Sequence, residues 1–220
     1  MENLEAVRVH YEGVLESGGD SGQKVGWRDT KAQIVRFQIV SQVLRGVPFD
    51  SVVDLGCGTG DLLQFLRTRG WTGSYKGVDV SPSMVAESRL SFSLDRLAEF
   101  EVSNSPSHAD VIIASGILNV CLDSSYDDWH RHCRQVISQM WQVASKAIVF
   151  NMLSIDSDIT RRKSGLAYMD PSEWLTYCRT LSRHVRLDQG YGQFDFTIAV
   201  FREHPDVPES DISCVAPATQ

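Results

Sequence analysis

The sequence predicts an α/β fold: a doubly wound, seven-stranded, mostly parallel sheet with a helical cap at the N-terminus. Strand-like and helix-like segments alternate from residue 50 to residue 203. The β-branched run Ser51–Leu55 ends in glycines spaced Gly-x-Gly-x-Gly, and a helix-forming run follows. The next strand-like run ends in an acid, Asp79, nineteen residues after the last of those glycines. These features predict a nucleotide-type ligand at the carboxyl ends of the first two strands.

Residues 1–45 are predicted to form the helical cap, lying across the ligand site. Apolar side chains recur at helical spacing within residues 3–16, and Ser17–Gly22 is a polar, glycine-rich loop. Asp29 or Thr30 can begin the second helix, which runs to about Arg45. The cap therefore precedes a Rossmann-like core that is expected to cover residues 50–203.

Within that core, β-branched and apolar runs bounded by polar turns predict the strands. These are Val52–Leu55, Ser74–Val80, Glu99–Ser103, Asp110–Ser115, Ala147–Met152, His184–Leu187 and Phe194–Phe201. Helical spacing predicts Asp61–Arg69, Pro82–Leu97, Tyr126–Ala144 and Pro171–Thr180. The tail 204–220 contains three prolines and few apolar residues, so we expect it to be loosely ordered. One domain is therefore expected over residues 1–203.

Composition narrows the class of protein. The chain has 220 residues, 42% of them apolar and 22% charged, which is ordinary for one globular domain. Its net charge of −7 disfavours a nucleic-acid partner, because such proteins need a basic footprint. No apolar run reaches the length of a membrane span, and the acidic N-terminus does not resemble a signal peptide.

The cysteines and histidines predict no metal site. The five cysteines are scattered and form no Cys-x-x-Cys pair, so neither zinc nor a disulfide framework is indicated. A reducing cytoplasm is the simplest location for such a chain. His130 and His132 lie on the predicted helix Tyr126–Ala144 and are expected to face solvent.

The glycine-rich turn has the form that binds a ligand through its backbone. Gly56, Gly58 and Gly60 allow a tight turn and a close approach that a Cβ would prevent. Asp79 is placed to accept hydrogen bonds from ribose hydroxyls. Cys57 is expected to act through its backbone and as a small filler.

At these residues the chain resembles the class I S-adenosylmethionine-dependent methyltransferases. Their first motif is matched by Asp54 and the three glycines, and their second motif is matched by Asp79. The resemblance implies strand order 3-2-1-4-5-7-6 with the last strand antiparallel. It also implies S-adenosylmethionine as cofactor and S-adenosylhomocysteine as product. A dinucleotide oxidoreductase would more typically show Gly-x-Gly-x-x-Gly, and position 61 is Asp.

The resemblance extends to further cofactor residues at the strand ends. Val80 and Met84 would contact the adenine, although Met84 serves equally well as core filling. Members of the family commonly have an acid after strand three. This chain has Ser103-Asn104, which makes Asn104 the candidate for the adenine amino group. Ser115 follows strand four. From the cap, Arg36 is the candidate partner of the methionine carboxylate; the alternative is a solvated helix residue.

Acceptor residues are expected on the cap and after the later strands. The candidates are Tyr11, Trp27, Asn119, Asn151 and Tyr168. Tyr11 suits a core or cap contact as well, and Trp27 can be a lid residue or a staple that packs the cap down. The stretches 110–120, 150–154, 167–171 and 194–198 resemble small bacterial methyltransferases of surface-polysaccharide or secondary-metabolite gene sets. The signature of nucleobase-amine methyltransferases and the acid cluster of magnesium-dependent catechol enzymes are both missing.

These patterns predict methyl transfer from S-adenosylmethionine to a small-molecule acceptor, of natural-product or sugar type, by in-line displacement. Positioning can supply much of the catalysis, so the lack of an obvious general base does not oppose this interpretation. One alternative is a catalytically silent S-adenosylmethionine-binding partner protein, and a weaker one is a nicotinamide-dependent reductase. The sequence specifies neither the methylated atom nor the oligomeric state.

Overall fold

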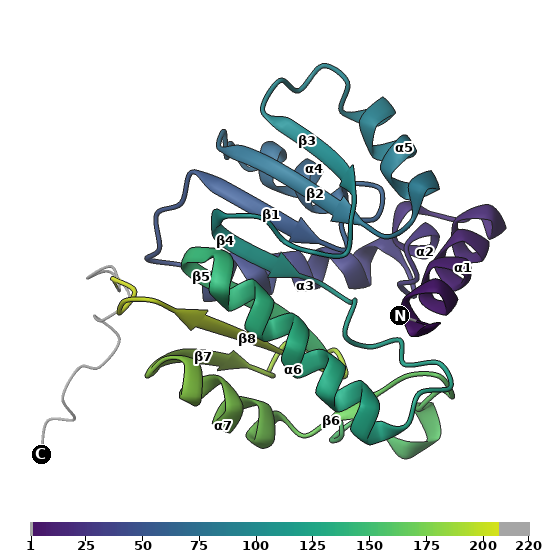
Figure 1. Ribbon diagram of the computed structural model, residues 1–220, viewed down its shortest axis with the longest axis vertical. Helices are drawn as coiled ribbons and strands as arrows, with labels where there is room; N and C mark the ends of the chain where they lie inside the picture. The colour runs from purple at the N-terminus through teal and green to yellow at the C-terminus, as the bar shows by residue number, and fades with distance from the viewer. Residues whose placement is uncertain (1, 207–220) are drawn as a thin grey trace, which may run out of the picture.

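The computed structural model describes residues 2–206, and within them one mixed sheet forms the centre of the molecule (Figure 1). Its strand order is β3-β2-β1-β4-β5-β8-β7, with β6 paired to the end of β5. The strands are β1 (Ser51–Leu55), β2 (Ser74–Asp79), β3 (Ala98–Val102), β4 (Ala109–Ala114), β5 (Ala144–Ser154), β6 (Tyr168–Met169), β7 (His184–Asp188) and β8 (Asp195–Phe201). Because β7 and β8 are the predicted sixth and seventh strands, the predicted order is confirmed. The antiparallel pairing of β8 with β5 and β7 is confirmed as well.

Helices cover both faces of this sheet. They are α1 (Glu2–Ser17), α2 (Ser21–Lys24), α3 (Thr30–Val43), α4 (Asp61–Thr68), α5 (Pro82–Ser91), α6 (Tyr126–Val143) and α7 (Pro171–Leu181), with a 3₁₀ turn η1 (Ile159–Arg161). One apolar cluster joins α6 and α7 to β4, β5 and β8, and a second joins α3, α4 and α5 to the opposite face. In Figure 1, α6 and α7 lie in front of the sheet and α3 lies behind it.

Local chemistry explains where these helices begin. Asp29 is the cap of α3 and accepts the amide of Ala32 at 2.7 Å. Ser125 caps α6, whose first turn contains two acids that suit the positive end of the helix dipole. The sequence predicted α3 and α6 to within a residue or two, since their capping residues and apolar spacing are both local.

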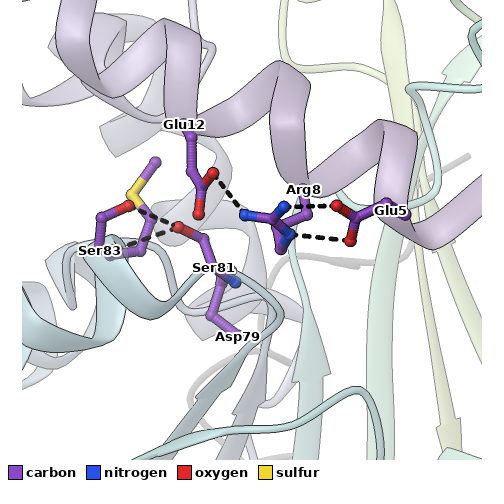
Figure 2. A network of polar contacts seen from close by, with 7 residues as sticks. Glu5, Arg8, Glu12, Asp79, Ser81 and Ser83 are labelled. Atoms are coloured by element: carbon purple, nitrogen blue, oxygen red, sulfur yellow. Dashed lines mark hydrogen bonds and ion pairs between the residues drawn. The ribbon is translucent and has the colours of Figure 1, made fainter.

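The N-terminal segment divides between two places. Phe37 and Val40 of α3 pack into the second apolar cluster, so α3 is part of the helical layer on the sheet. In contrast, α1 and α2 lie beside α5 at the carboxyl edge of the sheet, where Lys24 pairs with Glu87 at 3.5 Å. Figure 2 shows Arg8 of α1, which bonds Glu5 and Glu12, close to the turn that connects β2 to α5.

Three short elements differ from the prediction. The loop Ser17–Gly22 contains the start of α2, because Asp20 and Gln23 form a reciprocal capping box. The helix predicted to Leu97 ends at Ser91. Asp95 accepts the Leu97 amide at 3.0 Å in a turn. The two-residue strand β6 was not expected, because so short a run has no periodicity to detect.

Two further expectations concern the ends of the chain and membranes. Most of the tail 204–220 lies outside the described residues, which end at 206. Within residues 2–206, no helix is both long and apolar enough to cross a membrane.

Candidate functional site

A cavity of about 480 Å³ opens at the carboxyl ends of β1, β2 and β4. Strand order reverses between β1 and β4, the place where open α/β sheets bind ligands. The N-terminal segment supplies another wall through Tyr11 and Trp27. Thirteen residues that the sequence singled out line this cavity, namely Tyr11, Trp27, Arg36, Asp54, Gly56, Cys57, Gly58, Asp79, Val80, Met84, Asn104, Ser115 and Asn119.

Backbone geometry shapes the glycine-rich turn. The amides of Gly56 and Cys57 both donate to the Val78 carbonyl, at 2.7 and 3.1 Å. Gly58 has φ +53°, and a Cβ there would lie 2.8 Å from Cγ1 of Val25. The turn therefore needs glycine at 58 for its conformation and for the close approach of Val25. Gly60 is the left-handed N-cap of α4 and does not line the cavity.

Asp79 is fastened to the glycine-rich turn through its carboxylate. Oδ2 accepts the Gly58 amide and Oδ1 accepts the Ser81 amide, each at 2.9 Å. Burial raises the pKa of Asp79 above its usual range, and these two amides oppose that shift. Each oxygen keeps acceptor capacity, so the carboxylate can accept ligand hydroxyls without reorganising.

Asp54 lies deeper in the same wall. Its Oδ2 accepts the hydroxyl of Tyr75 at 2.6 Å. Burial is the largest cause that raises the pKa of Asp54, to about 7, and the Tyr75 hydrogen bond opposes the shift. The cavity therefore contains a carboxyl group that changes charge near neutral pH.

Two further polar groups line the cavity at β4 and α3. Ser115 follows β4, and its Oγ is buried without a hydrogen-bond partner. Buried hydroxyls are normally bonded, so this oxygen is open to a ligand group. Gln33 of α3 donates to Asp61 at 3.0 Å. Gln33 and Asp61 were not predicted as site residues, although Asp61 directly follows the glycine-rich turn in the sequence.

Arg36 lines the cavity as predicted, but its guanidinium already has partners. Nε and Nη2 donate to Asp195 of β8 at 2.5 and 2.7 Å, and Nη1 donates to the Ala32 carbonyl at 2.7 Å. The fork expected to hold a carboxylate of the cofactor is thus occupied by Asp195. The ring of Trp27 stacks against the guanidinium, with its centroid 4.1 Å from Cζ.

Asn151 belongs to this network and lies outside the cavity wall. Its Oδ1 accepts the Gly116 amide at 2.8 Å, and its Nδ2 donates to Asp195 at 3.5 Å. Tyr168 also lies outside the wall; its hydroxyl accepts the Lys163 amide at 2.9 Å. Both were predicted as acceptor contacts. Strand position placed them near the site but could not specify which way each side chain points.

Comparisons with known proteins agree with this geometry. A family model described as a methyltransferase domain matches residues 53–141, the stretch from β1 to α6. The protein Rv1506c of Mycobacterium tuberculosis, which is named as a methyltransferase, is 37% identical over 155 residues, covering 70% of this chain and 93% of that protein. The chain belongs to the class I S-adenosylmethionine-dependent methyltransferases.

Two further proteins are similar to the chain, one in sequence and one in fold. Trans-aconitate 2-methyltransferase of Escherichia coli is 27% identical over 142 residues, 64% of this chain and 46% of that enzyme. The crystal structure of magnesium protoporphyrin IX methyltransferase from Synechocystis PCC 6803, with bound S-adenosylhomocysteine, superposes with a TM-score of 0.61. It is 13% identical, covers 92% of this chain and 97% of that chain, and shows the shared fold.

The methyltransferase has polar groups in its cavity that the sequence analysis did not place there. His132 of α6, expected to face solvent, is half-buried and lines the cavity with Gln135 and Gln139. Burial lowers the pKa of His132 below its usual value, so the ring is neutral at pH 7. These three residues recur at helical spacing on one flank of α6. The spacing can be seen in the sequence, but it was missed because the side chains are polar.

Two observations concern metal ligands and the thiol of the glycine-rich turn. No cluster of three or more His, Cys, Asp or Glu side chains that could hold a metal ion occurs among residues 2–206. Burial raises the pKa of the Cys57 thiol, so it is protonated at neutral pH and suits the role of a small filler.

Proposed function

We propose that this methyltransferase transfers a methyl group from S-adenosylmethionine to a small-molecule acceptor within the cavity described above. The observation that carries the proposal is Asp79, whose two oxygens accept the amides of Gly58 in the glycine-rich turn and of Ser81, the cap of α5. In this arrangement Asp79 binds the ribose hydroxyls. Val80 and Met84 contact the adenine, and Asn104 bonds its amino group.

The methionine end of the cofactor extends toward β4 and α3. The Oγ of Ser115 supports this placement, because it is buried without a hydrogen-bond partner and can therefore bond the cofactor. Arg36 has one N–H left on each terminal nitrogen after its bonds to Asp195 and Ala32, and these are the donors available to a carboxylate. Arg36 thus assists the cofactor carboxylate without supplying a full charge to it.

The acceptor binds on the other side of the cavity, between the N-terminal segment and the ends of β4 and β5. Tyr11, Trp27 and Asn119 line it there, and Val7, Leu153 and Leu166 add apolar walls. S-adenosylmethionine supplies a methyl group bonded to a positively charged sulfur, ready for in-line displacement. The chain's own contribution is to align the acceptor with that methyl group and to exclude water by covering the cavity with Trp27 and Val25.

Two groups of the cavity wall bear on proton transfer. Burial, followed by the charge of Asp79, raises the pKa of Tyr11, so its hydroxyl stays protonated, whereas His132 is a neutral ring that can accept a proton. Positioning of the acceptor supplies the rest of the proposed rate enhancement. The small-molecule class of acceptor is supported by two relatives whose names give a tricarboxylate and a porphyrin as substrates.

Calorimetric titration with S-adenosylmethionine, S-adenosylhomocysteine and NAD tests the proposal. We expect the first two to bind and NAD to give no heat. At a concentration about one hundred times Kd, S-adenosylhomocysteine should add about 2.7 kcal/mol to the free energy of unfolding. Binding of NAD alone would favour a reductase. Cofactor binding without S-adenosylhomocysteine release across a broad acceptor panel would favour a silent partner protein.

A further inference from the structure

The charges around the cavity are unbalanced toward the negative. Three carboxyl groups line it, those of Asp54, Asp61 and Asp79, and Asp54 loses its proton only near neutral pH. Among the described residues of the wall, Arg36 is the single Lys or Arg, and its charge is compensated by Asp195 at 2.5 Å. The neutral ring of His132 adds no positive charge at pH 7.

The ion pair of Arg36 and Asp195 is built into the fold. The side chains are 7% and 0% exposed, and the pair joins α3 to the first residue of β8. Asn151 donates to the same carboxylate, and Trp27 covers the guanidinium. Separating this buried guanidinium from Asp195 would leave an uncompensated charge, so Arg36 keeps its partner and offers a second anion only its two remaining N–H groups.

The bound cofactor makes Arg36 still less available to an anionic acceptor. Arg36 retains two N–H groups, which are charge-assisted donors of the kind that binds carboxylates. The methionine carboxylate of the cofactor competes with the acceptor for both of them. An anionic acceptor would therefore meet carboxylates and a neutralised arginine. The wall residues left for the acceptor are neutral: Gln135 and Gln139, together with the Tyr11 hydroxyl.

We propose that Asp195 determines acceptor specificity, because by neutralising Arg36 it adapts the cavity to an uncharged, hydroxyl-bearing acceptor and against carboxylates and phosphates. We take methyl transfer in this cavity, as proposed above, as the starting point. Asp195 does not line the cavity, so it acts through Arg36 and is a specificity-determining residue rather than a catalytic one.

The experiment compares one carbon skeleton in two charge states. Trans-aconitate, a trianion at neutral pH, and its neutral trimethyl ester are titrated into protein saturated with S-adenosylhomocysteine. Binding of S-adenosylhomocysteine is measured first. If it does not bind, the proposed function fails, and this outcome is distinct from a failure of the specificity proposal. Asp195→Asn removes the compensating charge at constant size. Asp95→Asn is the matched control, because it frees Arg67, which does not line the cavity.

We expect the wild-type protein to bind the trianion at least about tenfold more weakly than the ester, or not at all. Asp195→Asn should bind the trianion at least about tenfold more tightly than wild type, with less than about a twofold change for the ester. Asp95→Asn should behave as wild type. Wild-type binding of the trianion as tightly as the ester would overturn the proposal, as would its methylation by the wild-type enzyme.

An Asp195→Asn variant that folds and gains no affinity for the trianion would also overturn the proposal, whether or not the ester binds. Circular dichroism shows whether the variant folds. If it does not, Val7→Arg adds a cation to the cavity wall without breaking a buried pair, and the same gain is expected. If the Val7→Arg variant binds the trianion as weakly as the wild-type protein does, the charge of the cavity does not determine the specificity.

Discussion

Trp27 and Gly116 are in direct contact, because a Cβ at residue 116 would lie 2.7 Å from Cζ2 of the indole. The same indole stacks on Arg36. Trp27 therefore joins the N-terminal segment to the loop after β4 across the cavity. Both interpretations of Trp27 from the sequence, a lid residue and a staple, are compatible with this contact, and mutation can separate them.

Gly116→Ala should displace the indole and weaken S-adenosylhomocysteine binding. The residue has φ +98°, so alanine also brings a backbone strain of about 1–2 kcal/mol. Gly70→Ala is the matched control, because Gly70 has φ +81° and no atom within 4 Å of an added Cβ. Thermal melting should show at least as large a destabilisation in Gly116→Ala as in Gly70→Ala, and calorimetry should show the affinity loss in Gly116→Ala alone. Equal affinity in the two variants would mean that the indole does not shape the cofactor site.

Asp79→Asn should weaken S-adenosylhomocysteine binding while the fold persists. The variant loses charge-assisted hydrogen bonds to the ribose, each worth about 1.5–3 kcal/mol, so Kd should rise by roughly tenfold to a hundredfold. Asp110→Asn is the control: that carboxylate also accepts a backbone amide, from Asp50 at 2.9 Å, but does not line the cavity. Unchanged affinity in a folded Asp79→Asn protein would remove Asp79 from the ribose site.

Asp54 should make the protein less stable as pH rises. Its pKa increases from the ordinary 3.8 to about 7 on folding, so the folded state binds this proton more tightly than the unfolded state. The free energy of unfolding therefore falls through this group between about pH 4 and pH 7. Asp54→Asn removes the effect, and its stability relative to wild type should rise across that window. Urea unfolding at several pH values measures the difference, and a constant difference would contradict the prediction.

Arg36 and Asp195 should show strong coupling in a double-mutant cycle. Arg36→Met or Asp195→Leu alone leaves one buried charge unpaired and should cost about 3–5 kcal/mol of unfolding free energy. The double variant should cost less than the sum of the two. The more exposed pair Arg67 and Asp95 should couple by about 1 kcal/mol or less. Additive costs at Arg36 and Asp195 in urea unfolding would show that the pair is not energetically linked.

The sequence by itself determined the fold, the family and the positions of the glycine-rich turn and Asp79. The glycine-rich turn and Asp79 could be predicted because both follow short strands whose residues are neighbours in the chain. Backbone turns, helix caps and hydrophobic periodicity depend on residues a few positions apart, so they can be recognised without the tertiary structure. The strand order was predicted from the family resemblance, which rests on the same glycine-rich turn and Asp79.

Only the tertiary structure decided which side chains meet. Arg36 could serve a ligand carboxylate or any acidic side chain, and its partner Asp195 lies 159 positions away. Asn151 was expected at a strand end, yet it lies within β5, paired with Thr197, and its amide oxygen accepts the Gly116 amide outside the cavity wall. A guanidinium or an amide can bond many partners equally well. Its choice follows from the packing of strands and helices, which no local pattern encodes.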